Sequence, residues 1–347
     1  MLIKNINSYL RKFVFTRYFT VKKFSNLLRI AYEYKAKKSI LMSYPCKLII
    51  DPCNSCVLSC PLCPTGRKDK GRKRAMMKFN DFRKVVDEVK DYLYEIDLYN
   101  WGEPLLNKDI FEMIEYAHKN NIRTRISSNL NFFEDDFSTK LVESGLDILI
   151  ISLDGTEQKT YKTYRRGGDF KKVMANIKRI ADEKKRQKSK TPYLVWQFLV
   201  MKQNENEIPK VYEMAKELGI DSVRIEPVRT DTSMEIFQSD EEKIEKGKEW
   251  LPKDEKLSRF DYKKKEKKVK KKSCIFLWSM PVINPNGSVS PCCAVYPEKY
   301  DFGNAFKEGL MKVWNNENYT ASRKLVSGKD FDASTVCVNC LKNGFIE

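Results

Sequence analysis

Between residues 47 and 226, six short apolar runs alternate with amphipathic stretches. The runs are typical of strands and cover residues 47–51, 96–100, 123–127, 148–152, 195–200 and 222–226. The stretches between them have the length and apolar spacing of helices, at 80–94, 108–120, 133–144, 170–188 and 206–218. Strands joined by helices of this length form parallel sheets. Six such units are too few for a closed barrel of eight, so we expect a partial, open (β/α)6 barrel of the α/β class.

The loops that follow the predicted strands carry the polar residues. Ligands of parallel α/β sheets bind beyond the carboxyl ends of the strands. Those loops hold residues 53–63, Gly102-Glu103-Pro104, Ser128-Asn129, Asp154-Gly155 and 226–229. We therefore expect these side chains on one rim of the barrel. Gly145 and Gly219 follow two of the predicted helices and indicate glycine caps at the helix ends.

The chain has 347 residues, which is longer than one hydrophobic core usually organises. We expect four parts: a basic amphipathic helical extension at 1–46, the barrel at 47–230, a charged lysine-rich insertion or linker at 231–272, and a small domain at 273–347. The last part is predicted to fold separately, with a β-hairpin and helices.

The net charge of +18 is uneven along the sequence. Basic residues gather in the first 38 positions, where Phe13, Phe15, Phe19, Phe24, Leu27 and Leu28 lie among them, and in a lysine run at 263–272. Such runs are most often solvated faces. For the N-terminal part, packing against the barrel competes with contact at a membrane surface. No nucleic-acid-binding module is recognisable, so nucleic acid is not an expected partner.

No secretory signal is visible at the N-terminus. The longest charge-free run, 273–296, contains Pro281, Pro285 and Gly287, which suit strands and turns better than a spanning helix. We therefore expect a soluble, cytoplasmic protein.

Ten cysteines fall into an early and a late group. In a cytosolic chain of this size, paired spacings favour metal binding over disulfides. The single histidine, His118, is interpreted as a helix-end residue, so a metal would depend mainly on sulfur. Zinc and iron–sulfur clusters are the two chemistries that fit.

The early group contains the spacing Cys56-x3-Cys60-x2-Cys63. Three thiolates can hold three irons of a [4Fe–4S] cube and leave the fourth iron open to a small chelating ligand. Cys53 lies outside this triplet, and we interpret it as a non-ligand; as a fourth ligand it would complete a zinc site instead. The triplet is the signature of the radical S-adenosylmethionine (SAM) superfamily, which this chain resembles along most of its length.

The resemblance implies that the amino and carboxylate groups of SAM chelate the open iron. Reductive cleavage then releases a 5′-deoxyadenosyl radical, which abstracts a hydrogen atom from the substrate. It also implies an electron donor such as flavodoxin or ferredoxin.

Further elements of the family follow the cysteine triplet in order. The resemblance implies a SAM-binding set that consists of Leu62, Gly102, Glu103, Ser128, Ser152, Asp154 and Arg165. Gly102-Glu103 resembles a Gly-Gly-Glu element that receives the methionine ammonium, although Trp101 replaces its first glycine. Ser152 and Asp154 belong to the strand end that meets the ribose and carboxylate, and Leu62 takes the position beside the adenine. An arginine in the Arg165-Arg166 pair suits the carboxylate, and we favour Arg165.

The late group resembles the auxiliary-cluster (SPASM or twitch) domain of the family. The resemblance implies a second, fully coordinated [4Fe–4S] cluster on Cys274, Cys292, Cys337 and Cys340, with a structural zinc on the same thiolates as the alternative. Asn286-Gly287 indicates a tight turn, which would make Cys274 and Cys292 hairpin neighbours. Cys293 should point away from the metal if that segment is extended.

A fully coordinated cluster suits an electron relay. We therefore expect an oxidoreductase, and the late cysteine layout resembles that of aminocyclitol dehydrogenases, which implies a carbohydrate or aminocyclitol alcohol as a small-molecule substrate. Glu226 and Arg229 are catalytic candidates for contact with substrate or its departing proton, although a surface salt bridge would explain them equally. The alternatives are a radical SAM peptide-modifying maturase and a zinc-stabilised nucleic-acid-binding protein. For a maturase, residues 1–46 are short for a leader-peptide-binding domain.

Overall fold

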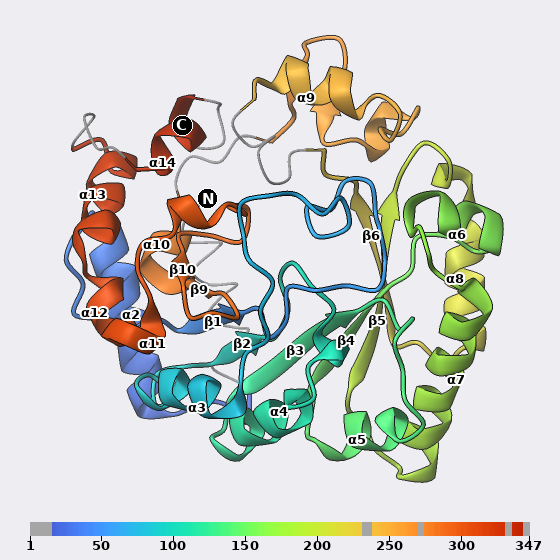
Figure 1. The fold of residues 1–347 in the computed structure, drawn as a ribbon, viewed down its shortest axis with the longest axis horizontal. Helices are drawn as coiled ribbons and strands as arrows, with labels where there is room; N and C mark the ends of the chain where they lie inside the picture. Colours follow the sequence, from blue (N-terminus) through green and yellow to red (C-terminus); the bar gives the residue numbers. More distant parts are fainter. Residues whose placement is uncertain (1–15, 231–237, 270–273, 330–334, 343–347) are drawn as a thin grey trace.

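The computed structural model describes residues 16–230, 238–269, 274–329 and 335–342 (Figure 1). Its centre is a sheet of eight strands in the order β10-β9-β1-β2-β3-β4-β5-β6. The six predicted strands are present as β1 (Lys47–Ile50), β2 (Glu95–Asp97), β3 (Arg123–Ser128), β4 (Ile148–Ser152), β5 (Tyr193–Val200) and β6 (Ser222–Pro227). Each pairs in parallel with the next, which confirms the partial parallel barrel.

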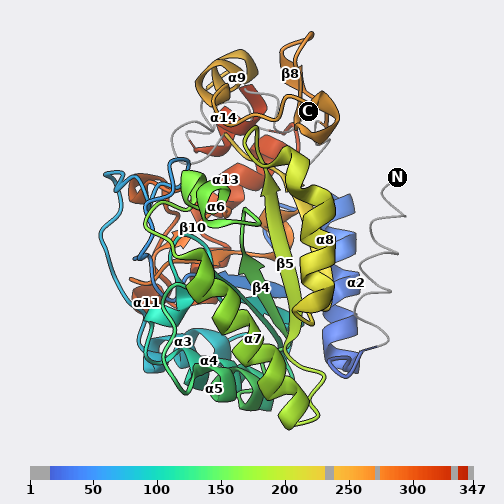
Figure 2. The ribbon, with the colours of Figure 1, turned by 90° about the vertical axis from the view of Figure 1, so that its right-hand side faces the viewer.

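Helices cover the outer face of this sheet (Figure 1, Figure 2). They are α3 (Phe79–Asp87), α4 (Ile110–Lys119), α5 (Phe137–Glu143), α7 (Phe170–Arg186) and α8 (Ile208–Glu217). Helix α3 is shorter than predicted, because residues 88–92 form turns. A further helix, α6 (Gln158–Tyr164), was not predicted. Gly145 and Gly219 adopt φ values of +78° and +69° directly after α5 and α8, so both predicted caps are confirmed.

The two faces of the sheet differ in character. Leu48 and Ile50 point into the main hydrophobic core, whereas Ile49 packs with Met280 and Val282 on the other face. On that inner face lies a buried ion-pair network. Its contacts are Lys47 Nζ to Glu95 Oε1 at 2.8 Å, Lys47 Nζ to Asp97 Oδ2 at 2.6 Å, and Arg125 Nε to Asp97 Oδ1 at 2.6 Å.

The C-terminal hairpin extends the barrel sheet. Strand β9 (Val282–Ile283) pairs in parallel with β1, and β10 (Val289–Ser290) pairs antiparallel with β9. The backbone N–H of Asp51 donates to the carbonyl oxygen of Ile283 at 2.9 Å. The C-terminal part thus shares the barrel sheet, because β1 bonds to β2 and β9 through its two edges. That this part folds separately stays a prediction.

Short helices complete the C-terminal part. They are α10 (Phe276–Ser279), α11 (Ala305–Glu308), α12 (Leu310–Trp314), α13 (Glu317–Val326) and α14 (Cys337–Lys342). A carboxylate from the barrel side caps one of them: Glu88 accepts from the backbone N–H groups of Leu310 and Met311 at 3.0 and 3.1 Å.

The N-terminal helix α2 (Val21–Lys35) begins at Thr20, whose side chain caps it. Leu27 and Ile30 are buried, whereas Leu28 is exposed. Beyond α2, the carbonyl of Lys38 accepts a hydrogen bond from the indole of Trp278 at 3.0 Å, so this segment packs against the C-terminal part. Of the amphipathic residues named above, Phe13 and Phe15 lie outside the described residues.

Among the helices of the described ranges, none combines the length and apolar character needed to cross a bilayer.

The buried ion-pair network provides a test of the inner face. Removing one partner of a buried pair typically costs about 3 kcal/mol or more, because it leaves an uncompensated buried charge. Asp97→Asn should therefore lower the free energy of unfolding by roughly 3 kcal/mol in urea titrations. Glu245→Gln, which breaks an exposed pair with Lys248, is the control and should change it little. Equal effects of the two variants would contradict the presence of a buried ion-pair network at Asp97.

Candidate active site

The early cysteine loop begins at the carboxyl end of β1. An antiparallel bridge between Cys53 and Met76 closes its base. Within the loop, the backbone N–H of Cys63 donates to the carbonyl of Cys60 at 3.1 Å. Burial raises the pKa of Cys56 to about 12, and the negative charges of Glu103, Cys60 and Cys63 add to the shift. The three thiols of the triplet therefore lie within electrostatic reach of one another.

Two polar side chains contact these sulfurs. The amide Nδ2 of Asn129 donates to Cys56 Sγ at 3.5 Å, and Arg165 Nη1 lies 4.0 Å from Cys60 Sγ. Cys53 instead accepts from the backbone N–H of Ser55 at 3.4 Å. Donors aimed at sulfur stabilise the thiolate that a metal requires. That Cys53 is not a ligand stays a prediction.

Glu103 is fully buried beside this loop. Its carboxylate accepts from the backbone N–H groups of Asn129 at 2.9 Å and Leu105 at 3.2 Å. The Ser128 hydroxyl also hydrogen-bonds to it. Burial outweighs these hydrogen bonds and raises the pKa of Glu103 to about 7. A neighbouring ammonium group would restore the ionised form, which is what a carboxylate for the methionine amine needs.

Gly102 is required by a close approach of two backbones. A Cβ at this position would lie 1.7 Å from the carbonyl oxygen of Cys53. The next residue, Glu103, donates its backbone N–H to Ser55 at 2.8 Å. The Gly-Glu element is therefore held directly against the cysteine loop, and a side chain at Gly102 would push it away.

Asp154 and Arg165 form a buried ion pair at the end of β4. Arg165 Nε lies 2.6 Å from Asp154 Oδ2, while Asp154 Oδ1 accepts from the backbone N–H of Leu199 at 2.8 Å. Arg165 is 13% exposed and turned inward, whereas Arg166 is exposed. The geometry thus favours Arg165 over Arg166 as the cation near the cysteines, and its pairing fixes the guanidinium in place.

The remaining predicted SAM residues have simpler environments. The Ser152 hydroxyl lies 3.2 Å from that of Ser127. Leu62 packs against a hydrophobic cluster that includes Leu58 and Cys60. Thus Ser128, Glu103, Asp154, Arg165 and Leu62 gather around the triplet, while Ser152 is placed only through Ser127.

The charged insertion forms a folded cover. It contains α9 (Asp240–Gly247) and a hairpin of β7 (Phe260–Asp261) with β8 (Glu266–Lys267), beyond the carboxyl end of β6 (Figure 1, Figure 2). Trp250, Leu251 and Phe260 from this segment pack against Leu58 and Cys60. The sequence interpretation of this segment depended on its lysines. It did not use these three apolar residues, which indicate a folded segment. Leu58 and Cys60 are buried beneath the cover, whereas Cys56 and Cys63 stay partly exposed.

The two catalytic candidates lie at the end of β6 and just beyond it. Glu226 Oε1 is 3.1 Å from Arg224 Nε, and Glu226 Oε2 is 3.9 Å from Arg259 Nη2. The salt-bridge interpretation of Glu226 is therefore observed. Arg229 is half-buried beyond the strand. A contact of either residue with substrate stays a prediction.

The late cysteines converge on one place. Burial raises the pKa of Cys292 well above its usual range, and charges on Cys293, Cys340 and Cys274 add to it. Burial likewise raises the pKa of Cys337, with contributions from Cys340 and Cys274. Each of the four predicted ligands is thus electrostatically coupled to others of the set.

The route to this convergence differs from the prediction. Cys274 precedes α10 and does not sit on the hairpin, so it is not a strand neighbour of Cys292. Cys293 packs with Ile49 and Met280, whereas Cys292 packs against the main core. The thiols of Cys292 and Cys293 therefore have different surroundings. The chain turns at these residues and is not extended, so the extended backbone assumed for Cys293 is not observed.

The thiol chemistry fits iron–sulfur ligation. All ten cysteines are described, and none is joined in a disulfide. Within the described ranges, no three cysteine, histidine or carboxylate side chains are grouped as one metal ion would require. The thiols of a cube bind different irons and stand further apart. His118 ends α4 and contacts the carbonyl of Gly145 at 3.1 Å, which confirms its interpretation as a helix-end residue.

Comparison with known proteins agrees with this geometry. A family model of the Radical SAM superfamily matches residues 50–215, and one described as an iron–sulfur cluster-binding domain, SPASM, matches residues 274–341. The AdoMet-dependent heme synthase of Methanosarcina barkeri is 27% identical over 194 residues, which cover 54% of this chain and 53% of that protein. The chain thus spans about half the length of this relative.

Two solved structures share the fold. BtrN in complex with AdoMet and 2-DOIA superposes with a TM-score of 0.51 at 16% identity, covering 86% of this chain and 93% of that one. Streptococcus suis SuiB bound to the precursor peptide SuiA superposes with a TM-score of 0.61 at 17% identity, covering 93% and 74%.

The fold and the two cysteine sites define an iron–sulfur enzyme built on a partial parallel barrel. The chain belongs to the radical SAM superfamily and carries a C-terminal SPASM domain. These domains imply SAM and two [4Fe–4S] clusters as cofactors. Neither match supports the alternative of a zinc-stabilised nucleic-acid-binding protein.

One residue at the site, Asp51, escaped the sequence interpretation, and a second, Asn129, was expected on the rim but was given no role. Asp51 is buried at the end of β1, and burial raises its pKa to about 7. One of its oxygens accepts from the backbone N–H of Trp101 at 3.3 Å. Asn129 contacts Cys56 and Glu103, as described above. Their positions directly after β1 and β3 were the available signal, because strand ends carry the site.

Iron content tests the two ligand sets. Reconstituted protein should hold about eight irons if both clusters are [4Fe–4S]. Replacing Cys56, Cys60 and Cys63 together by alanine should roughly halve that content. Cys53→Ala is the matched control and should leave it unchanged. A loss of iron in the control would make Cys53 a ligand.

Glu103→Gln tests the ammonium site. It should weaken SAM binding in calorimetric titrations while preserving the cluster spectrum, because Glu103 contacts no iron in this assignment. Since the pKa of Glu103 is about 7, wild-type affinity should rise as the pH increases through that value. The variant should lose this dependence. A variant that keeps wild-type affinity and pH profile would contradict the assignment.

Proposed function

We propose that this radical SAM enzyme is an oxidoreductase that converts an alcohol carbon of a small carbohydrate or aminocyclitol into a ketone. The observation that supports this most is the convergence of Cys274, Cys292, Cys337 and Cys340. Four thiolates coordinate every iron of a cube, so that cluster has no open position for substrate. Such a cluster can accept an electron, which oxidation of the substrate requires; a purely structural staple is the alternative use.

The chain's own residues bind and orient the cofactor. Glu103 would accept a hydrogen bond from the methionine amino group, and Arg165, fixed by Asp154, would hold the carboxylate. When bound, SAM and its cluster supply hydrogen-atom abstraction by the 5′-deoxyadenosyl group, with an electron donor such as flavodoxin or ferredoxin. Trp250 and Phe260 exclude water from the side of the cover, which protects a reactive radical.

Formation of a ketone also requires that the hydroxyl proton leave the substrate. Glu226 is the carboxylate that we assign to this task, at the end of β6 where ligands of parallel sheets bind. Arg224 and Arg259 hold it in place, and Arg229 follows on the same rim. Glu226 would take the hydroxyl proton, and a cluster held by Cys274, Cys292, Cys337 and Cys340 would supply the acceptor for the electron.

A second candidate function is that of a peptide-modifying maturase. The observation in its favour is the superposition with SuiB, a protein described with its precursor peptide, along 93% of this chain. The similarity is one of fold alone. A peptide substrate would replace the small alcohol in the same site.

Contact with a membrane surface through the basic N-terminus also stays a prediction, because residues 1–15 lie outside the described residues.

The relay can be tested at one partly buried ligand. Cys340→Ser should still form 5′-deoxyadenosine from SAM, because the triplet is intact, but oxidised product should fall much further. The measurement is the ratio of product to 5′-deoxyadenosine with candidate alcohols and peptides, in a variant shown by circular dichroism to be folded. Cys293→Ser is the control and should keep the wild-type ratio. A wild-type ratio in Cys340→Ser would reject the relay.

A further inference from the structure

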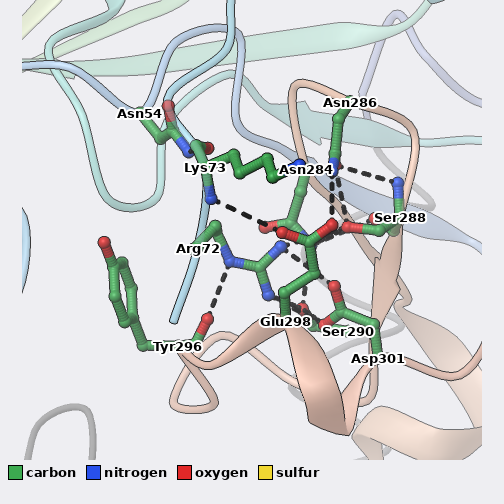
Figure 3. Close-up of polar contacts among 10 residues, drawn as sticks. All are labelled: Asn54, Arg72, Lys73, Asn284, Asn286, Ser288, Ser290, Tyr296, Glu298 and Asp301. Atoms are coloured by element: carbon green, nitrogen blue, oxygen red, sulfur yellow. Dashed lines mark hydrogen bonds and ion pairs between the residues drawn. The ribbon is translucent and has the colours of Figure 1, made fainter. Parts of the chain in front are cut away.

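The segment between the cysteine triplet and α3, residues 64–78, holds a buried arginine. The side chain of Arg72 is only 1% exposed, although it lies in a connection without regular secondary structure. Figure 3 shows that its guanidinium points into a polar frame formed by the C-terminal part of the chain. A buried guanidinium is costly unless all of its donors are satisfied.

Every N–H of this guanidinium has an acceptor. The contacts are Nε to the Tyr296 carbonyl at 2.7 Å, Nη1 to Ser288 Oγ at 3.0 Å and Asp301 Oδ2 at 2.9 Å, and Nη2 to Ser290 Oγ at 3.3 Å and Asp301 Oδ1 at 2.8 Å. The pair with Asp301 is bidentate, a geometry that arginine makes and lysine does not. All five acceptors come from residues 288–301, so the contact joins distant parts of the chain.

The frame around Arg72 is itself rigidly bonded (Figure 3). Ser290 Oγ donates to Asp301 Oδ1 at 2.6 Å, and Asn284 Nδ2 donates to Ser290 Oγ at 2.9 Å. Next to the arginine, the backbone N–H of Glu298 donates to the carbonyl of Gly71 at 2.7 Å. The hairpin, the turn at 298–301 and the segment 64–78 are thus bonded as one unit.

The segment is also tied back to the early cysteine loop. Asn54 Nδ2 donates to the carbonyl of Lys73 at 2.8 Å, and its Oδ1 accepts from the backbone N–H of Ala75 at 2.8 Å. Trp101 also meets Tyr296 edge to face, with ring centroids 5.4 Å apart. The aromatic residue that replaces the family glycine therefore contacts the auxiliary domain.

A continuous set of contacts consequently connects the ligand loops of the two clusters. It runs from Asn54, just before Cys56, through Arg72 to Ser290, just before Cys292. We propose that Arg72 is a positioning residue: its bidentate pair with Asp301 locks the segment 64–78 to the auxiliary domain and so sets the separation of the two clusters. This role does not depend on which substrate is oxidised, nor on whether the reaction is an oxidation.

The test compares arginines of the same segment in reconstituted holoenzyme. Arg72→Gln and Asp301→Asn remove the pair that crosses between the two parts. Arg67→Gln is the matched control, because Arg67 makes a bidentate pair with Asp69 inside the segment, at 3.1 and 2.6 Å. Iron content is measured first, and only protein that carries both clusters is compared.

The first measurement is hydrogen–deuterium exchange. In Arg72→Gln, the amides of 64–78 and 288–302 should exchange roughly tenfold faster or more, because a buried ion pair that closes this unit is broken. Amides in α4 and β4 should keep their rates, which separates local release from general destabilisation. Arg67→Gln should match wild type. Wild-type exchange in Arg72→Gln would overturn the proposal.

The second measurement is the magnetic dipolar interaction between the two reduced clusters, observed by electron paramagnetic resonance. It weakens steeply with distance, so Arg72→Gln and Asp301→Asn should reduce it while Arg67→Gln should not. An unchanged interaction in the first two variants would overturn the proposal, as would its absence in wild type.

If both variants fail to fold, hydrogen–deuterium exchange in wild type decides. The segments 64–78 and 288–302 should open with one common rate, and independent rates would overturn the proposal.

Discussion

Strand β1 is hydrogen-bonded on both edges, and the rest of the structure depends on that pairing. Its residues pair with β2 on one side and with β9 on the other, so barrel and auxiliary domain share one backbone ladder. The cysteine triplet follows β1, and the hairpin that leads to Cys292 begins with β9. Because a strand is nearly inextensible, the two ligand loops start from fixed points in the same sheet. Arg72 then adds a second connection further along both loops.

Burial of carboxyl groups characterises the site that this pairing builds. Asp51 and Glu103 both have pKa values raised to about 7 by burial. A carboxyl with a raised pKa in the folded state binds its proton more tightly there than in the unfolded chain. Its stabilising contribution is therefore complete at low pH and is lost as the pH rises through about 7. Without cofactors, the two buried carboxylates thus lower the free energy of unfolding at neutral pH, and a bound cation would stabilise them.

The sequence was sufficient for the elements that obey local rules. The six strands, the caps at Gly145 and Gly219 and the cysteine spacings follow from periodicity, turn chemistry and short-range motifs. Contacts between distant segments were not predictable in this way. The pairing of β9 with β1 involves only two residues of each strand, too short for any periodic signal. Arg72 looks like one basic residue among many, and only the tertiary structure supplies its five acceptors.

Two different kinds of contact enclose the cysteine triplet. On the auxiliary side, the Arg72 guanidinium uses all its donors on buried acceptors, so separation would expose an unpaired charge in the interior. On the side of the cover, Trp250 and Phe260 pack against Leu58 and Cys60, and Arg259 makes a partly exposed pair with Glu226 of β6 at 3.9 Å. Exposed pairs contribute little, and apolar surfaces separate without stranding a charge. The charged contact between cover and barrel is therefore a partly exposed one, whereas the charged contact on the auxiliary side is buried and uses every donor of its guanidinium.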